Sequence, residues 1–340
     1  MVSLIATRVL TLIAVFVAAT YGRDLYAAPA SGKIAVGFAA MSSASLVLWT
    51  AQDEKLLAKN GIDADLIFMP GAPTLVAAIN TGSLAVGYTG GTATLGAAAA
   101  GADFKIIESS HGRILHDLVV KSNIKEPKHL RGKRIGVTSI GGTGWMAGIL
   151  GLEQLGLNPD KEKIIFSGFG DMRVIAKALE SGTIDAALVS GNFTNDLKRM
   201  GYHTLGELGR IPFIGSAVVV KQSLLQSQPE FSQSFVKGLI EAQAYVMSPG
   251  KKQSVLRVLS KRLNIADLSV AEDTLQYLIK SLDKKPYPSI EGLRNIQRLM
   301  QLRNPKIGQI NLQDVIDDSI VRDFDKRGYI DQVYAEYGVP

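Results

Sequence analysis

The sequence predicts an α/β protein built from two similar doubly wound lobes, and two observations lead to that prediction. Short motifs recur about 100 residues apart in the same order, with Lys33-Ile-Ala-Val-Gly37 matched by Lys133-Arg-Ile-Gly-Val137 and Ala78-Ile-Asn-Thr-Gly-Ser-Leu84 by Ala178-Leu-Glu-Ser-Gly-Thr-Ile184. A solenoid unit is shorter, at roughly 50 residues or fewer. Within each copy, strand-like and helix-like segments alternate, which is typical of a parallel sheet covered by helices.

The first copy shows apolar strands separated by helices that end at glycine. Apolar residues at helical spacing predict a helix over residues 45–60, and Gly61 and Gly82 follow the predicted helices as C-terminal stop signals. The expected strands and helices of this copy, in order, are residues 34–38, 45–60, 64–69, 73–81 and 84–88.

The second copy follows the same plan, and Gly156 and Gly182 are its helix stop signals. Its expected strands and helices are residues 134–138, 143–155, 163–166, 172–181 and 185–189. Beyond residue 223 the pattern is helical, for example over 231–247 and 270–282, which indicates helices that complete the first lobe and flank a cleft.

Two extended segments, residues 117–122 and 216–221, bracket the second copy and share the motif Leu118-Val-Val-Lys121 and Val218-Val-Val-Lys221. They are hinge candidates if the chain leaves and re-enters the first lobe through them, and an interpretation as ordinary sheet strands fits equally well. The expected organisation is a signal peptide at 1–30, lobe one from 31–118 with 221–340, and lobe two from 119–220.

The N-terminus has the pattern of a cleaved export signal. One positive charge precedes an apolar run over 9–19, and Ala28-Pro-Ala30 supplies small residues for cleavage near Ala30. The run is about 11 residues, well short of the roughly 20 that span a bilayer. The chain has no cysteine, which excludes disulfides, thiolate metal sites and a lipid-modified cysteine. Periplasmic localisation is the expected outcome.

The loops at the carboxyl ends of the predicted strands are small, hydroxylic or glycine-rich. In an open parallel sheet ligands bind at these ends, where backbone N–H groups at helix N-termini favour anions. Serine, threonine and glycine also simply cap helices and form turns, so a single loop of this kind is weak evidence. The candidate ligand-binding residues are Ser42, Ser43, Gly71, Thr89, Gly90, Gly91, Thr92, His111, Gly142, Thr143, Gly144, Gly170, Ser190 and Asn192.

Other chemistries receive little support. Gly142-Thr-Gly144-Trp-Met-Ala147 fits a loose dinucleotide fingerprint, but no acidic residue ends the next strand. His111 and His116 are five residues apart, off the spacing of one helix face, and no histidine–carboxylate set has metal-ligand spacing. No nucleophile motif is present, and Asp171 is expected to cap a helix. We therefore expect no enzyme activity, cofactor or metal.

The net charge of +6 is spread among acids with no basic stripe interleaved with aromatic residues, which disfavours nucleic acid as a partner. Four aromatic residues flank the predicted cleft loops and could stack on a planar ligand, although each also suits a core position. They are Phe38, Trp145, Phe169 and Phe193. His111 could face the cleft or be a solvated loop residue.

The sequence resembles the periplasmic substrate-binding proteins of ATP-binding-cassette importers, in the branch that includes sulfonate, taurine, nitrate and thiamine-precursor binders. The resemblance covers about residues 33–225. It rests on the signal peptide, the serine-rich first loop and three phrases, which are Leu-Leu-Ala-Lys-Asn-Gly-Ile62, Ala-Ala-Ile-Asn-Thr-Gly-Ser-Leu84 and Leu130-Arg-Gly-Lys-Arg-Ile-Gly-Val137.

The resemblance implies a type II periplasmic binding protein fold with two lobes joined by a two-strand hinge. It also implies a monomer that closes around a small, anionic or planar organic ligand and delivers it to a membrane permease and its ATPase. By position, ligand contacts would come from Ser42 and Ser43, from residues 89–92 and from residues 142–144. His111 and Arg113 are the candidate cationic groups.

The alternative on the same fold is an enzyme or precursor-binding protein of pyrimidine or thiamine metabolism, against which the export signal argues. The loops in which the two copies differ, residues 89–92 and 190–193, are where ligand choice is expected to lie.

Overall fold

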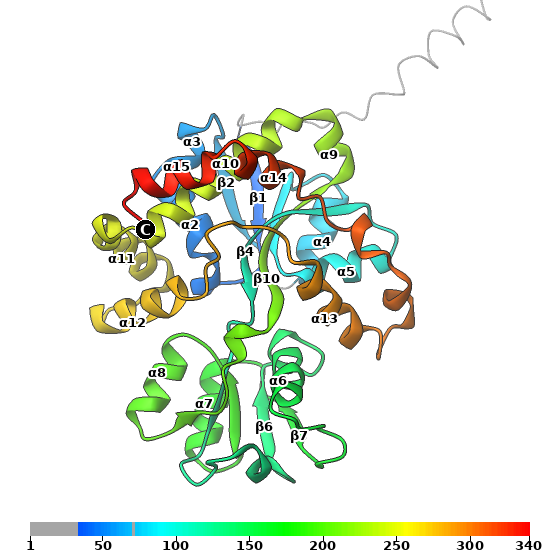
Figure 1. Cartoon of the computed structure of the whole chain (residues 1–340), viewed down its shortest axis with the longest axis vertical. Coiled ribbons are helices and arrows are strands. Elements are labelled where there is room, and N and C mark those ends of the chain that lie inside the picture. Colours follow the sequence, from blue (N-terminus) through cyan, green and yellow to red (C-terminus); the bar gives the residue numbers. More distant parts are fainter. Residues whose placement is uncertain (1–32, 70–71) are drawn as a thin grey trace, which may run out of the picture. The chain divides into compact units, whose positions relative to one another are not determined.

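Two five-stranded mixed sheets organise residues 34–340 (Figure 1). The computed structural model describes residues 33–69 and 72–340, so the predicted signal segment at 1–30 and Gly71 lie outside the described residues. In spatial order the first sheet contains β2 (Ala64–Phe68), β1 (Ile34–Phe38), β3 (Val86–Thr89), β10 (Pro212–Lys221) and β4 (Phe104–Arg113). The second contains β7 (Ile165–Gly168), β6 (Arg134–Val137), β8 (Ala186–Val189), β5 (Asp117–Val120) and β9 (His203–Thr204).

The two sheets have the same topology, which confirms the predicted two-lobe α/β fold. In each sheet the third parallel strand, β3 or β8, pairs with an antiparallel strand that is not part of the repeat forming the other three. That strand is β10 in the first sheet and β5 in the second. The registers match, because Ala217 pairs with Thr89 in the first sheet and Asp117 pairs with Val189 in the second.

Both segments proposed as hinge candidates are therefore regular sheet strands, the second of the two interpretations. The chain passes between the lobes just outside them. It leaves the first sheet through residues 114–116, between β4 and β5, and returns through Ile211, between the short helix η3 (Leu208–Arg210) and β10. These connections lie on the same side of the ligand cavity described below.

The sequence repeat is shifted by one residue in its first strand. Gly37 pairs with Ile67 and Gly87, whereas Gly136 pairs with Ser167 and Ala187. Gly37 is thus the structural equivalent of Gly136 and not of Val137, as the literal motif alignment suggested. Both glycines lie where a Cβ would come within 2.5 Å of a side chain from the following repeat motif, Leu84 Cδ1 at 2.4 Å or Ile184 Cδ1 at 2.5 Å.

Helices follow the parallel strands in both lobes. In the first lobe these are α2 (Leu46–Asp53), α3 (Leu56–Lys59), α4 (Ala72–Asn80) and α5 (Gly91–Ala99). The second lobe has α6 (Thr143–Gln154), α7 (Met172–Glu180) and α8 (Asn192–Arg199), with the short helix η2 (Pro127–Leu130) before β6.

Several predicted boundaries were wrong, and at two of them the cause is a residue other than glycine with positive φ. The helix predicted over residues 45–60 is divided into the short helix η1 (Ser43–Ser45), α2 and α3, because Lys55 adopts a left-handed conformation with φ of 58°. The strand predicted at 163–166 begins two residues later, since Lys163 also has positive φ and lies in a turn.

The predicted helix stop at Gly82 is reproduced at Gly182. Their φ angles are 78° and 80°, in a region that residues with a Cβ rarely adopt. The residue before each glycine, Thr81 or Ser181, directs its hydroxyl to the carbonyl oxygen three residues earlier, at 3.1 and 3.2 Å. The repeated motif therefore encodes a repeated turn.

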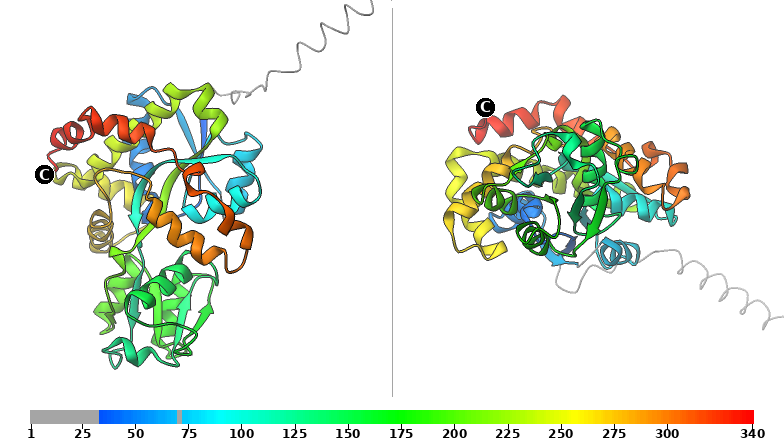
Figure 2. Two further views of the ribbon diagram at one scale, coloured as in Figure 1. Left: turned by 45° about the vertical axis from the view of Figure 1, so that its right-hand side comes forward. Right: turned by 90° about the horizontal axis from the view of Figure 1, so that it is seen from below.

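The segment after β10 is helical and gathers on the first lobe, as Figure 2 shows. Its α-helices are α9 (Gln222–Ser227), α10 (Pro229–Met247), α11 (Lys252–Leu263), α12 (Leu268–Ile279), α13 (Ile290–Met300), α14 (Ser319–Lys326) and α15 (Tyr329–Glu336). Three short 3-10 helices connect them, η4 (Pro249–Lys251), η5 (Pro305–Gln309) and η6 (Leu312–Asp314).

The core covers both faces of the first sheet and continues into the second lobe. One cluster packs α2 and α10 against β1 and β3, with Trp49 and Phe235 fully buried. A second cluster runs from Phe104 through Ile114 and Ile211 to Met146. The connections between the lobes are thus part of the apolar core, which ties the position of the second lobe to the packing of the first.

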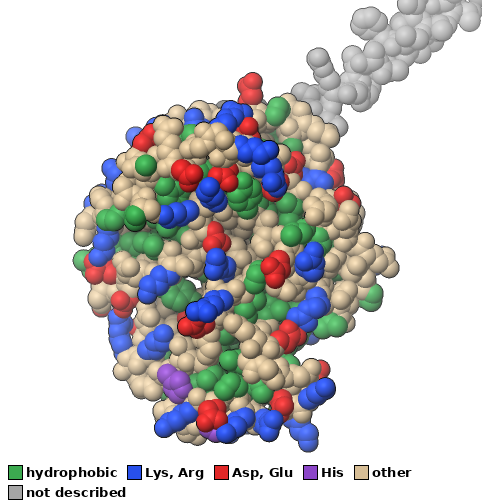
Figure 3. All heavy atoms as spheres, viewed as in Figure 1, with side chains coloured by type: hydrophobic (Ala, Val, Ile, Leu, Met, Phe, Trp, Pro, Cys, Tyr) green, Lys and Arg blue, Asp and Glu red, His purple; other side chains and the backbone are tan. Residues whose placement is uncertain are grey.

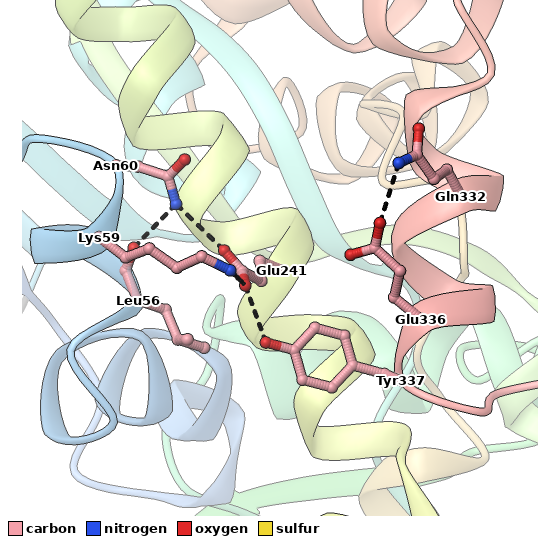
Figure 4. Close-up of polar contacts among 7 residues, drawn as sticks. All are labelled: Leu56, Lys59, Asn60, Glu241, Gln332, Glu336 and Tyr337. Atoms are coloured by element: carbon pink, nitrogen blue, oxygen red, sulfur yellow. Dashed lines mark hydrogen bonds and ion pairs between the residues drawn. The ribbon is translucent and has the colours of Figure 1, made fainter.

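A charged cluster around Glu241 anchors the C-terminal helix to α10 (Figure 4). The Glu241 carboxylate is 5% exposed and accepts hydrogen bonds from Lys59 Nζ, from Asn60 Nδ2 at 3.2 Å and from Tyr337 OH at 2.8 Å. Burial alone would raise the pKa of Glu241, but these three donors hold the pKa below its ordinary value.

We expect Glu241→Ala to lower the free energy of unfolding by about 2 kcal/mol, because it removes hydrogen bonds to a charged group and leaves a lysine without its partner. The depressed pKa means that the carboxylate stabilises the fold above the ordinary pKa of glutamate and that this contribution is lost as the pH falls through the folded pKa. Denaturant unfolding at neutral and acidic pH measures both effects. Glu230→Ala, at an exposed position of α10, is the control and is expected to change little.

None of the helices within the described residues combines the length and apolarity that a bilayer-spanning helix requires. On the face shown in Figure 3, lysine and arginine side chains are interspersed with aspartate and glutamate. That face therefore carries no continuous basic stripe.

Candidate ligand-binding site

A cavity of about 400 Å³ lies between the two sheets, at the carboxyl ends of their parallel strands. Three parts of the chain line it. The strand-end loops and helix N-termini contribute, among others, Ser42, Ser43, Thr143, Met172, Arg173, Ser190 and Gly191. The connections between the lobes contribute Arg113, Ile114, Leu115, His116 and Phe213. The C-terminal helices add Leu263, Ile265 and Thr274. A volume of this size is in the range of about 300–1,000 Å³ that organic ligands occupy.

Two buried serines hold the first-lobe loop that carries Ser42 and Ser43. Ser45, at the end of η1, donates a hydrogen bond to the carbonyl oxygen of Ala40 at 2.6 Å. Ser216 of β10 donates to the carbonyl oxygen of Ala44 at 3.3 Å. Because both ends of the loop are tied to the scaffold, the two hydroxyls are presented in a defined position.

The second lobe presents the N-termini of three helices to the same cavity. Thr143 begins α6, and Gly191 precedes α8 with φ of 60° and ψ of −128°. Asp171 caps α7, as predicted, by accepting a hydrogen bond from Arg173 N at 2.7 Å. The lobes approach closely here, because a Cβ on Gly191 would lie 3.9 Å from Ser43 Oγ. Helix N-termini carry partial positive charge, so this wall favours an anion.

Two arginine side chains add positive charge to the cavity, as the helix N-termini do. Arg113 pairs with Asp283 at 3.2 Å, whereas the guanidinium of Arg173 forms no ion pair with any residue that the structure describes. No aspartate or glutamate is found among the described residues that line the cavity. The arrangement therefore leaves one arginine available to a ligand carboxylate, sulfonate or similar group.

His116 lies where the connection from β4 meets α6. A methyl group on Gly144 would be 3.5 Å from its Nε2 atom, so the ring packs against the first turn of the helix. Burial lowers the pKa of His116 to about 4. The ring is consequently neutral at neutral pH and offers one donor and one acceptor rather than a charge.

The structure brings four of the predicted site residues into the lining of the cavity. They are Ser42, Ser43, Thr143 and Ser190. Gly142 and Gly144 flank Thr143 at the start of α6 without lining the cavity, and Gly170 lies in an exposed turn before α7. The backbone of Asn192 begins α8, directly after the lining residue Gly191.

The predicted loop of residues 89–92 does not line the cavity, because other parts of the chain cover it. Thr89 is 8% exposed and pairs with Ala217 of β10. A Cβ on Gly90 would lie 3.1 Å from the carbonyl oxygen of Gly215, and one on Gly91 would touch Leu293 and Ile296 of α13. In the second lobe β5 lies beside Val189 in the same way, but among the described residues a Cβ on Gly191 would have only Ser43 Oγ within 4 Å, at 3.9 Å. Thr92, in the first turn of α5, is also absent from the lining.

His111 is neither a solvated loop residue nor part of the cavity lining. It lies within β4 opposite Ser216, is fully buried, and has no hydrogen-bond partner at either ring nitrogen among the described residues. Burial lowers its pKa to about 4. The prediction failed because β4 extends to Arg113, further than the apolar pattern indicates.

Of the four aromatic candidates, only Phe193 lines the main cavity. Phe38 packs edge-on against Trp49, and Phe169 packs against the core of the second lobe. Trp145 borders a separate cavity of about 290 Å³ beside α13.

Arg173, His116 and the C-terminal residues Leu263, Ile265 and Thr274 were missed. Arg173 follows the predicted cap Asp171 by two residues, and that position in the first helical turn was the available signal. Leu263 and Ile265 carry no such signal, because they come from a segment far along the chain. No group of three or more His, Asp or Glu side chains in the described ranges could hold a metal ion.

The sequence from residue 42 to residue 251 matches the family model described as NMT1/THI5 like. The chain belongs to the NMT1/THI5-like family. No curated protein sequence matches it significantly.

Solved structures share the fold of this family member at low sequence identity. The periplasmic aliphatic sulphonate binding protein SsuA from Escherichia coli has a TM-score of 0.69 at 19% identity, over 84% of this chain and 92% of SsuA. The periplasmic nitrate-binding protein NrtA from Synechocystis PCC 6803 has a TM-score of 0.62 at 14% identity, over 91% of each chain. A DszB mutant in complex with biphenyl-2-sulfinic acid has a TM-score of 0.64 at 16% identity, over 87% of this chain and 99% of DszB. The predicted periplasmic-binding-protein fold is thereby confirmed.

Proposed function

We propose that this protein is a periplasmic solute-binding protein that captures a small organic anion between its lobes and delivers it to an ATP-binding-cassette permease. The observation that carries the proposal is Arg173, an arginine without an ion-pair partner in the described structure, beside three helix N-termini in a cavity without carboxylates. The family and the fold support the transport role, and the signal-like segment at 1–30 supports export.

The proposal involves binding without chemistry. The chain has no cysteine, and His116 has no carboxylate among the lining residues to orient it as a general base. The other polar lining groups are hydroxyls, guanidinium groups and backbone N–H groups, which recognise an anion without activating it.

The two connections at residues 114–116 and at Ile211 are the proposed hinge. The expected limits of 31–118 with 221–340 for lobe one and 119–220 for lobe two therefore move, because β10 lies in the first sheet and all of β5 lies in the second. We assign 34–113 and 212–340 to lobe one and 117–210 to lobe two. Polar contacts also join described residues of the two lobes away from the hinge. Arg298 of α13 pairs with Glu153 of α6, Arg303 donates to the carbonyl oxygen of Ile140 at 3.3 Å, and Arg199 of α8 pairs with Asp273 of α12. Exposed pairs of this kind are weak, so we propose that ligand contacts with both lobes provide the main drive for closure.

We expect Arg173→Gln to weaken anion binding by about tenfold to hundredfold, because hydrogen bonds to charged groups contribute about 1.5–3 kcal/mol. Isothermal titration with ethanesulfonate, benzenesulfonate, benzoate and nitrate measures the loss. Uracil is the neutral probe, for which the variant should make little difference.

Arg134→Gln is the matched control, because it removes the same charge from the same lobe at the exposed start of β6, outside the cavity. It should bind as the unmodified protein does. Failure of every anion to bind the unmodified protein would refute the proposed function. Equal affinities of Arg173→Gln and the unmodified protein would refute the role of Arg173.

A further inference from the structure

Apolar residues line the main cavity from several segments, and one of these segments is separate from the strand-end loops that form the polar wall. The serine and threonine hydroxyls and Arg173 come from strand-end loops and from the first turns of the helices that follow them. Leu263 is the last residue of α11, and Ile265 lies in the turn between α11 and α12. This turn lies beyond residue 251, where the family match ends. The part of the chain outside the family model therefore contributes its own section of the ligand cavity.

The local sequence explains why this turn presents apolar groups. Asn264 ends α11 in the left-handed conformation, with φ of 52°, and the amide of Ile265 donates to the carbonyl oxygen of Ser260 at 3.0 Å. This is the hydrogen bond of a Schellman stop, which folds the residue after the cap back against the helix. Leu263 and Ile265 are both only partly buried by the protein, and both pack against the first-lobe core.

The surfaces near this turn are also apolar. Ile114, Leu115 and Phe213 line the cavity from the connections between the lobes, and no charged residue of α11 or α12 is in the lining. A bound inorganic oxyanion would satisfy the polar wall but leave the partly buried Leu115, Leu263 and Ile265 facing water. Burial of apolar surface is favourable, at about 25 cal/mol per Å².

We infer that the ligand is an amphiphilic organic anion whose hydrocarbon portion packs on the α11–α12 turn, with Leu263 and Ile265 determining how much hydrocarbon is accepted. This inference rests on the proposed function, since it requires the anionic group to bind at the polar wall that contains Arg173. It assigns selection among anions to a C-terminal turn rather than to the two loops in which the sequence repeats differ.

The test is titration with a homologous series, ethanesulfonate, butanesulfonate and hexanesulfonate, which share one head group. Each methylene buried on the turn should raise affinity about fourfold, corresponding to about 0.8 kcal/mol. In the double variant Leu263→Ala/Ile265→Thr the increase along the series should be at least halved on a logarithmic scale, while ethanesulfonate should bind within about threefold of its original affinity.

Leu268→Ala is the matched control. Leu268 is 55% exposed at the start of α12, three residues beyond Ile265, and does not line the cavity. It should retain the full dependence on chain length. If the double variant does not fold, the single variant Ile265→Thr replaces it. That variant should show a smaller reduction in the dependence of affinity on chain length.

The outcomes separate the two proposals. Equal or falling affinity along the series in the unmodified protein would overturn the inference and leave the proposed function standing. An equal loss for all three sulfonates in the double variant would also overturn it, because the turn would then support closure without contacting the tail. Absence of binding for every sulfonate, together with the carboxylates and nitrate, would instead remove the proposed function.

Discussion

Gly292→Ala is expected to lower the free energy of unfolding by about 2 kcal/mol and to weaken ligand binding, although alanine is the better helix former. Gly292 lies in the first turn of α13, where the helix rests directly on β10. A Cβ at this position would lie 2.7–2.8 Å from the backbone C, Cα and N atoms of Phe213. Backbone atoms cannot rotate away as a side chain can, so the helix or the strand must move.

The expected loss of binding follows from the position of Phe213, a core residue that also borders the cavity. Asn295 also fastens α13 to this strand, by donating to the carbonyl oxygen of Pro212 at 3.0 Å. Displacement of the helix would therefore shift the return connection between the lobes. Denaturant unfolding and titration with benzenesulfonate measure the two effects.

Gly96→Ala is the matched control for this substitution. Gly96 lies within α5, and a Cβ there would meet only Met300 Cε, at an ordinary contact distance of 3.9 Å. It should stabilise the protein by up to about 1 kcal/mol through helix propensity. If Gly292→Ala changes stability and binding as little as Gly96→Ala does, the predicted clash between α13 and β10 is refuted.

Glu108→Gln is expected to stabilise the protein by about 3 kcal/mol at pH 7. Glu108 lies in β4 and is fully buried; its Oε1 accepts a hydrogen bond from Ser110 Oγ at 2.6 Å, and its Oε2 has no partner among the described residues. Burial raises the pKa of Glu108 to about 8, with a smaller opposite effect from Ser110. The folded protein therefore holds a proton that the unfolded chain releases above about pH 4.5.

Glu108 is expected to make the folded protein less stable as the pH rises. Because the folded state binds more protons, the stability contributed by protonated Glu108 is complete below the ordinary pKa of 4.5 and is lost as the pH rises toward 8. Glutamine resembles the protonated carboxyl and does not titrate. The variant should thus lack the decrease in stability that the unmodified protein shows across this interval.

Two histidines, the fully buried His111 and the half-buried His116, contribute with the opposite sign at lower pH. Burial lowers the pKa values of His111 and His116 from 6.5 to about 4, so the stability that they contribute is lost as the pH falls below 6.5. Unfolding measured between about pH 6.5 and pH 8 isolates the Glu108 effect from theirs. Glu180→Gln, at an exposed carboxylate of α7, is the control. Parallel stability curves for Glu108→Gln and the unmodified protein would contradict the prediction.

The duplicated motifs predicted the fold well because they encode local geometry. The glycines at 82 and 182 stop helices in the same way, and the strands that follow them pair in the same registers with β10 and β5. What the motifs could not reveal is where the lobes separate. Strands on either side of a hinge have the same apolar sequence pattern, so the pattern does not tell which sheet a strand joins. Only the strand pairing in the structure locates the crossings between the lobes, at residues 114–116 and at Ile211.

The candidate site was predicted in part, and its failures share one cause. Ser42, Ser43, Thr143 and Ser190 line the cavity because strand-end loops of both lobes meet there. The loop at 89–92 has the same composition but is covered by β10 and α13, which are more than 100 residues away in the sequence. Composition identifies a loop that could bind an anion and contains no information on what packs over it.

The sequence alone determined that this chain forms two related α/β lobes, because helix stops, glycines and apolar alternation are local properties that each segment carries. Only the tertiary structure decided which polar groups share a cavity, that Arg173 and His116 belong to it, that His111 does not, and that the α11–α12 turn supplies an apolar wall. Those outcomes depend on burial and on contacts between distant segments. The lining of the cavity is therefore set by long-range packing, whereas the fold around it is encoded in local repeats.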